Sequence, residues 1–179
     1  MPYPTTLPTK RFLIRYSGIF DFAGLYQLMA DWMKARRYWF QETDYKHKVN
    51  PGGAEQEIDF DGERQITEYI KENVHVFIHI WDMTEVEVER NGIKKKLANG
   101  RIELIIFGKL ELDWEGRWKG SKILEFFGDF YNRYIMRKTV EDYWDKLHYR
   151  MIKFQDMIKQ FLDMQSKGNE YAGYLGDNV

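Results

Sequence analysis

Two Asn-Gly pairs, at residues 91–92 and 99–100, constrain the fold of this chain more than any other feature. Each pair lies between runs in which apolar and charged residues alternate. An Asn-Gly pair in this setting is the strongest short-range signal for a tight β-hairpin, because the favoured two-residue turn needs positive φ angles. The sequence therefore predicts a three-stranded antiparallel meander from about residue 84 to residue 114.

The two turns also predict which residues face each other across the strands. The first turn pairs Arg90 with Ile93, and the second sets Leu97 opposite Ile102. The register gives one apolar row and one charged row, formed by Val86, Leu97 and Ile102 and by Glu87, Lys96 and Glu103 respectively. We expect the apolar row to face the core and the charged row, with the carboxylates near it, to face solvent.

The segments before the meander predict one helix and several strands. Asp21 is a suitable N-cap, and apolar residues recur at three- and four-residue steps from Phe22 to Met33. Strands are expected at 10–17, 38–49, 56–60, 64–72 and 74–81, with turns at 50–53 and at Asp61-Gly62. The strand at 74–81 is apolar on both faces, which is typical of a central strand.

The segments after the second turn predict a bent strand and a long helix. Gly108 interrupts the apolar face of the strand at 101–114, which indicates strong curvature there or, alternatively, two separate strands. A helical pattern begins after Ser121 and continues to about Met164. At ~1.5 Å per residue such a helix would be ~65 Å long, more than the width of a domain of this size. We expect either a break near Thr139 or a continuous helix that overhangs the sheet.

The bulk composition excludes several classes of protein. With 27 basic and 28 acidic residues, the chain lacks the positive charge of a nucleic-acid binder. It has no Cys, which excludes disulfides, thiolate catalysis and cysteine-ligated metals and suits the cytoplasm. No apolar run reaches the ~20 residues of a membrane span, and no secretory signal is apparent. We expect one domain at 10–166, with a flexible arm at 1–9 and a flexible tail at 167–179.

These elements predict an α+β fold with one N-terminal helix and a curved antiparallel sheet of about six to seven strands packed on a long C-terminal helix. Over about residues 10–165 this order resembles the helix-grip fold of the START and polyketide-cyclase-like superfamily. The resemblance rests on element order and on no short motif. It implies that the sheet wraps around the last helix and leaves a cavity between them. The chain departs from it in having one helix after the first strand and a longer final helix. A simpler α+β sheet with helices on one face is the alternative.

The aromatic content, 17%, suggests a ligand cavity lined by rings. We expect a hydrophobic or aromatic small molecule to bind between the sheet and the C-terminal helix, although the same rings could simply fill the core. The candidate ligand-binding residues come from the sheet and from the helix: Trp39, Tyr45, His75, Phe77, His79 and Trp81, and Tyr131, Tyr134, Trp144 and His148.

No catalytic residue, metal site or cofactor is expected. The Cα atoms of His75 and His79 should lie ~13 Å apart on one strand face, too far for both to bind one metal ion. A small hydrolase, cyclase or isomerase remains an alternative, and it would need one of these histidines, or His148, beside a carboxylate in the cavity.

The methionine-rich end of the C-terminal helix suggests a second function, as an interaction protein. If this end extends beyond the sheet, its apolar face must be buried in a partner or in a second copy of the chain. The candidate partner-binding residues are Met151, Phe154, Met157, Ile158, Phe161 and Met164. If the helix does not overhang, the same residues belong to the core.

Overall fold

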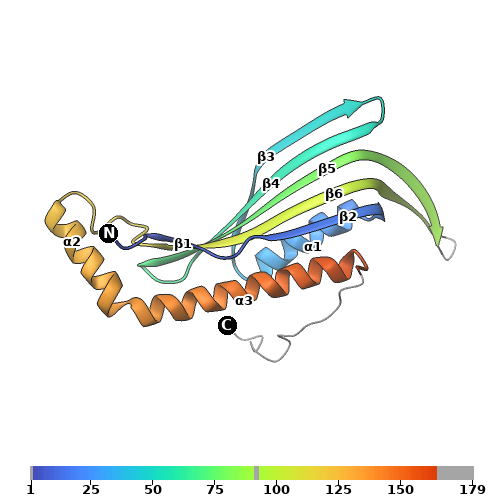
Figure 1. Ribbon diagram of the computed structural model, residues 1–179. Coiled ribbons are helices and arrows are strands. Elements are labelled where there is room, and N and C mark those ends of the chain that lie inside the picture. The colour runs from blue at the N-terminus through green and yellow to red at the C-terminus, as the bar shows by residue number, and fades with distance from the viewer. Residues whose placement is uncertain (1, 91–92, 165–179) are drawn as a thin grey trace.

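Six antiparallel strands form one open, curved sheet, and the two longest helices, α1 and α3, lie against one face of it (Figure 1). The computed structural model describes residues 2–90 and 93–164. The strands are β1 (Thr6–Pro8), β2 (Phe12–Phe20), β3 (Trp39–Asn50), β4 (Gly53–Gln65), β5 (Ile70–Arg90) and β6 (Ile93–Leu112). Their order is β1-β6-β5-β4-β3, and β2 also pairs with β6. The α+β class and the antiparallel sheet expected from the sequence are confirmed.

The first and last strands are neighbours. β2 pairs with the middle of β6, from Phe12 opposite Ile106 to Phe20 opposite Ala98. β1, in the proline-containing stretch expected to be an arm, pairs with the end of β6. At the changeover, Gly108 N donates to Thr9 Oγ1 and Thr9 N donates to Gly108 O. The N-terminal segment from Thr6 is therefore held on the edge of β6.

Helix α1 (Phe22–Ala35) begins where the sequence predicts, because the Asp21 side chain accepts a hydrogen bond from Gly24 N. After β6 come α2 (Lys122–Phe130), a π-helical turn η1 (Tyr131–Ile135) and α3 (Arg137–Phe161). The expected break in the C-terminal helix is present, but it lies in η1 and at Met136 rather than at Thr139. Figure 1 shows α2 turned away from the axis of α3 and projecting beyond the sheet.

The core lies between the sheet and helices α1 and α3. Alternate residues of β5 from Val74 to Ile80 are fully buried, which confirms β5 as a central strand. From α3 the buried apolar side chains are Val140, Leu147, Met151, Phe154, Ile158 and, just beyond its end, Leu162. The ring of Phe154 stacks on Trp32 of α1 with a centroid distance of 4.0 Å. The middle of the interface between α3 and the sheet is therefore packed with apolar side chains.

This packing bears on whether the methionine-rich end of α3 is a partner surface or part of the core. Met151, Phe154 and Ile158 are 0% exposed, and Met157 and Met164 pack partly buried against the same core. Phe161 is 37% exposed at the end of α3. The overhang lies at the other end of the C-terminal helical segment, in α2. Most of the residues at 151–164 pack on the core, which is the alternative that the sequence left open. The tail expected at 167–179 lies outside the described residues.

The first half of the predicted meander is confirmed. Glu87 pairs with Lys96 and Val86 with Leu97, in the register that a turn at 91–92 requires. Residues 91–92 themselves lie outside the described residues. The register of a hairpin could thus be derived from its flanking pattern alone.

The second predicted turn, at Asn99-Gly100, is wrong. Both residues lie inside β6, where Asn99 pairs with Thr84 and Gly100 with Gly18. A Cβ on Gly100 would stand 2.8 Å from Trp81 O, so the glycine serves a close backbone approach at an irregularity of β5. Leu97 and Ile102 lie five residues apart on one continuous strand, so they point to opposite faces and the predicted apolar row does not form.

Of two further glycines, Gly62 was misread as a turn, and Gly108 lies in a continuous strand as mainly expected. Asp61-Gly62 lies within β4, and a Cβ on Gly62 would stand 3.0 Å from Met33 Sδ of α1. The strands expected at 56–60 and 64–72 are therefore one strand, β4, and the start of β5. Gly108 lies in unbroken β6, where a Cβ would stand 3.0 Å from Leu147 Cγ. At both positions glycine lets a helix approach the sheet closely.

Candidate functional site

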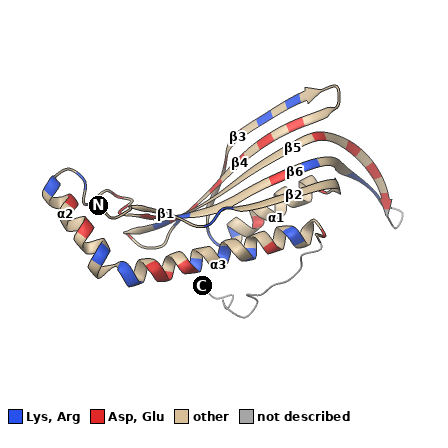
Figure 2. Cartoon of the chain, viewed as in Figure 1, with Lys and Arg blue, Asp and Glu red and all other residues tan. Residues whose placement is uncertain are grey.

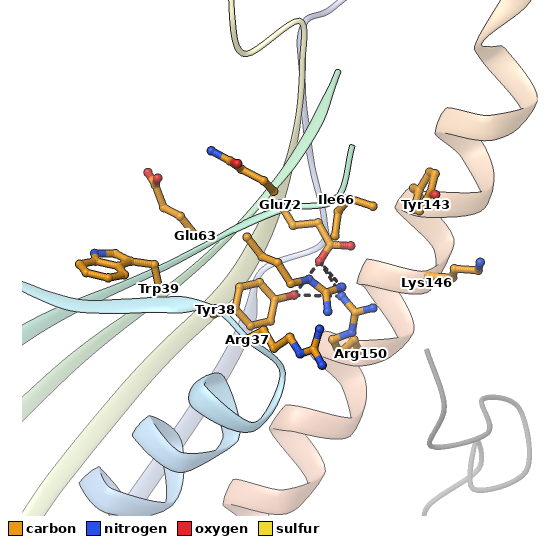
Figure 3. A pocket seen from close by; sticks show the side chains of 11 residues that line it. Arg37, Tyr38, Trp39, Glu63, Ile66, Glu72, Tyr143, Lys146 and Arg150 are labelled. Carbon is orange, nitrogen blue, oxygen red and sulfur yellow. Dashed lines mark hydrogen bonds and ion pairs between the residues drawn. The ribbon is translucent and has the colours of Figure 1, made fainter. Parts of the chain in front are cut away.

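An open pocket of about 850 Å³ lies at one end of the interface between the sheet and α3 (Figure 3). Residues of β3, β4, β5, α3 and the α1–β3 and β4–β5 connections line it: Arg37, Tyr38, Trp39, Glu63, Arg64, Gln65, Ile66, Glu72, Tyr143, Lys146 and Arg150. Its volume falls in the range of ~300–1,000 Å³ that is typical of small-molecule sites. We refer to it as the arginine pocket.

The turn that ends α1 places Arg37 in solvent and Tyr38 in the core. Arg37 N donates to Lys34 O, and Tyr38 N donates back to Met33 O. Arg37 has a φ of 60°, the left-handed conformation that commonly ends a helix. The turn leaves Arg37 exposed while Tyr38 is buried.

A buried carboxylate is the centre of the pocket's polar network. Glu72, on β5, is 1% exposed, and it lies directly across from Arg64 of β4 in the strand pairing. Its Oε2 accepts hydrogen bonds from Tyr38 (2.7 Å), Arg64 (2.9 Å) and Arg150 of α3 (2.6 Å). Arg150 also donates to the Tyr38 hydroxyl at 2.9 Å. Figure 3 shows these bonds as dashed lines, and those from Tyr38, Arg64 and Arg150 to Glu72 meet at one of its oxygens.

The network leaves polar groups without partners. Within residues 2–90 and 93–164, Glu72 Oε1 and Arg64 Nε are buried and make no hydrogen bond. Buried polar groups are nearly always satisfied, by protein, water or a ligand. One acceptor and one charged donor beside the pocket are therefore unsatisfied by the described residues.

The pocket also carries an excess of positive charge. Four of its lining residues are basic and two, Glu63 and Glu72, are acidic, so the formal sum is 4 − 2 = +2. Glu63 is engaged by Lys71 outside the pocket at 3.4 Å. Arg37 makes no ion pair with the part of the chain that the structure describes. The charge balance favours an anion over a cation or a neutral molecule.

Tyr38 acts as a hydrogen-bond donor in this pocket. Burial raises the pKa of its hydroxyl far above the ordinary value, and the negative charge of Glu72 raises it further, against the opposing effect of Arg150 and Arg64. The hydroxyl therefore stays protonated at physiological pH. It donates to Glu72 and accepts a hydrogen bond from Arg150.

The other walls of the pocket are apolar or aromatic. Trp39 is 73% exposed at one end, and Tyr143 and Lys146 lie on α3 at the other (Figure 3). Lys146 Nζ is 5.5 Å from the centroid of the Tyr143 ring. Ile66, in the β4–β5 connection, adds an aliphatic surface. The pocket thus combines a charged floor with a rim on which a flat ring could pack.

A second polar cluster lies on the opposite face of the sheet. His75 contacts Asp61 at 2.8 Å and Asp59 at 3.2 Å. His79 contacts Glu55 at 2.8 Å. The side-chain atoms of Glu55, Glu57 and His79 that could coordinate a metal ion lie within 4.8 Å of one another. These three residues have the donor types of a divalent metal site. They also pair with one another across the strands, and this pairing alone explains their position as a cross-strand charge ladder.

The structure does not bring the predicted ligand-binding residues together. Of the ten residues predicted to bind a ligand, only Trp39 lines the arginine pocket. His75, Phe77, His79 and Trp81 alternate with the buried residues of β5 and so lie on the face away from the helices, and Tyr45 is exposed on the edge strand β3. The cause is the alternation of side chains along β5. Its buried residues Val74, Val76, Ile78 and Ile80 face the helices, so the aromatic and histidine residues between them face away.

The helical members of the predicted set also lie elsewhere. Tyr131 packs against Tyr69 and Trp118, and Tyr134 is 68% exposed on η1. Trp144 donates its indole N–H to Pro8 O and stacks on His148 with centroids 5.2 Å apart. Burial lowers the pKa of His148, although Asp145 opposes this effect. None of these four residues lines the arginine pocket.

Sequence reasoning missed Tyr38, Arg64, Glu72 and Arg150, yet signals for two of them were present. Glu72 continues the alternation of Val74, Val76 and Ile78, so it falls on the buried face of β5. Arg150 lies on the apolar stripe of α3, one residue before buried Met151. A charged residue on a buried face needs a partner of opposite charge. The positions of Glu72 and Arg150 on two buried faces therefore indicate that they form a pair.

Comparison with known proteins adds no identification. A scan against family models and a search of curated proteins both returned no match to this chain. Among the described residues, no helix combines the length and apolarity needed to cross a bilayer.

Proposed function

We propose that this protein binds a small anionic molecule with an aromatic or apolar part in the arginine pocket, between the sheet and the C-terminal helix. The observation that carries the proposal is the group of buried Arg150, Tyr38 and Glu72 with partly buried Arg64, in which positive charge exceeds negative charge. A carboxylate or phosphate would complete it, because guanidinium groups bind both with charge-assisted, directional hydrogen bonds.

The polarity of the proposed ligand differs from that expected from the sequence. The central part of the interface between the sheet and α3 is filled by side chains such as Leu147 and Phe154. The arginine pocket lies beside this packed region and has a charged floor. A ligand with one anionic end on Arg64 and Arg37 and a ring near Trp39 or Tyr143 would use both kinds of surface.

The proposal also includes a helix-grip architecture. It is supported by the neighbouring first and last strands and by a C-terminal helix packed on the sheet. In the superfamily that this order resembles, ligands occupy the space between these elements. In this chain the arginine pocket lies beside the packed middle of that space.

Calorimetric titration with phenyl phosphate and benzoate tests the proposal. Either probe should bind the full chain, and Arg37→Gln should weaken binding about tenfold, as expected for the loss of one charge-assisted hydrogen bond. Arg37 is exposed and outside the buried network, so its replacement leaves the fold intact.

The matched control is Lys48→Gln, which removes the same charge from an exposed position on β3. Binding by this variant should equal that of the wild type. Equal weakening in both variants would mean that the probe responds to net charge alone. Absence of binding by both probes would reject an anion site in this pocket.

A further inference from the structure

A second surface of the molecule carries exposed apolar side chains. Seven large apolar residues of α2 and η1 are exposed, and we refer to them as the α2 apolar face: Ile123, Leu124, Phe126, Phe127, Phe130, Tyr134 and Ile135. Phe126 and Tyr134 are each 68% exposed. Four exposed aromatic rings alone present roughly 400 Å² of surface, comparable with the largest apolar patch of a typical monomer.

The spacing of these residues makes the face continuous. Positions 123, 126, 127, 130 and 134 follow the steps of three and four residues that place side chains on one side of a helix. Such spacing is the anchor pattern of helices that bind to an apolar surface. The face is therefore one stripe and not a set of scattered side chains.

The opposite side of α2 is already packed, so this stripe is not an unfilled part of the core. Gly128 is buried, and a Cβ on it would stand 2.8 Å from Trp118 Cγ. The Asp129 side chain accepts a hydrogen bond from Tyr3 N at 3.0 Å. In η1, Asn132 accepts from the Tyr69 hydroxyl at 2.7 Å. These contacts hold α2 in place with its apolar face outward.

Basic residues surround the α2 apolar face. Residues 119–138 contain five Lys or Arg and two Asp or Glu, a formal charge of 5 − 2 = +3, in a chain whose net charge is −1. Lys119, Lys122 and Lys138 make no ion pair with any residue in the described ranges 2–90 and 93–164. Figure 2 shows these positive segments on α2 and at its junction with α3, at the end that projects beyond the sheet.

We propose that the α2 apolar face docks on an anionic lipid surface. An apolar, aromatic helix face bordered by lysine is the arrangement of helices that lie in the membrane interface. A flat bilayer can reach α2 because it projects beyond the sheet (Figure 1). A symmetric second copy fits less well, because two-fold pairing of α2 with itself would bring the same basic residues together.

Co-sedimentation with vesicles tests the proposal on the full chain. The protein should bind vesicles that contain phosphatidylserine and phosphatidylcholine, and bind vesicles of phosphatidylcholine alone more weakly. Raising the salt from about 0.1 M to about 1 M should weaken binding to the anionic vesicles, because it screens the lysines. The double variant Phe126→Ser/Phe130→Ser should bind more than tenfold more weakly, since two exposed rings no longer enter the apolar layer.

The matched control is Tyr45→Ser/Val49→Ser, which removes side chains of similar exposure, 52% and 76%, from the edge strand β3, far from α2 (Figure 1). This variant should bind vesicles like the wild type. No binding to anionic vesicles, or equal loss in both variants, would overturn the proposal. A dimer in light scattering that only Phe126→Ser/Phe130→Ser dissociates would also overturn it, because the face would then be covered by a second copy.

Discussion

At the scale of single residues, the buried charges of the arginine pocket carry a cost that their contacts must offset. Removing Glu72 and Arg150 from water is unfavourable, and the pair is stable only because each charge meets a partner at short distance. Arg64 joins them with its side chain 19% exposed. The network is therefore sensitive to the loss of its one central carboxylate.

Replacing Glu72 by Gln should lower the free energy of unfolding by about 3 kcal/mol, because Arg64 and Arg150 would lose their shared negative partner. Chemical denaturation measures the change. Glu63→Gln on β4 removes a more exposed carboxylate, 49%, and should cost less than about 0.5 kcal/mol. A loss of similar size in the two variants would contradict the importance given to Glu72.

Only part of the arginine pocket could be predicted from the sequence, and the reason lies in its individual residues. Glu72 and Arg150 could have been found from the alternation of β5 and the stripe of α3. Arg64 and Tyr38 could not, because their positions depend on the pairing of β4 with β5 and on the turn that ends α1. Tyr38 contacts residues 34 and 112 positions away, and such contacts are set by the tertiary fold and leave no local pattern.

At the scale of elements, the helices and the hairpin at 86–97 were predictable, and three glycines were not. Asp21 and Ser121 cap α1 and α2 as expected, because capping depends on neighbours in sequence. Gly62, Gly100 and Gly108 look like turn or bend signals in the sequence. In the structure each lets another segment approach the sheet, which is a contact that only the fold specifies.

Gly108→Ala should destabilise the protein by about 1–3 kcal/mol, because the new Cβ would stand 3.0 Å from Leu147 Cγ and push α3 from the sheet. Thermal or chemical unfolding measures the effect. Combining it with Leu147→Ala should cost less than the sum of the two single changes, since the smaller side chain makes room for the Cβ.

The control is Gly52→Ala in the β3–β4 turn, where a Cβ would meet no atom within 4 Å. This change should alter stability by less than about 0.5 kcal/mol. If Gly108→Ala were equally harmless, the close approach of α3 to β6 would not be the reason for this glycine.

At the scale of the whole molecule, the fold separates three surfaces. The arginine pocket lies between the sheet and α3, the histidine and carboxylate ladder lies on the open face of the sheet, and the α2 apolar face projects at one end. The sequence favoured a ligand site among the aromatic residues. The sheet instead places its histidine and aromatic set on the open face, and the polar pocket forms where β3, β4 and β5 meet α1 and α3.

The account rests on the claim that the arginine pocket receives an anion. The most direct measurement follows the arginine Nε–Hε signals by NMR while phenyl phosphate is added. Arg64 Nε, which lacks a partner among the described residues, should shift and saturate. The signal of Arg15, whose side chain is 72% exposed and paired with Glu103 on β6, should stay in place. An unmoved Arg64 signal, or parallel shifts of Arg64 and Arg15, would contradict the claim.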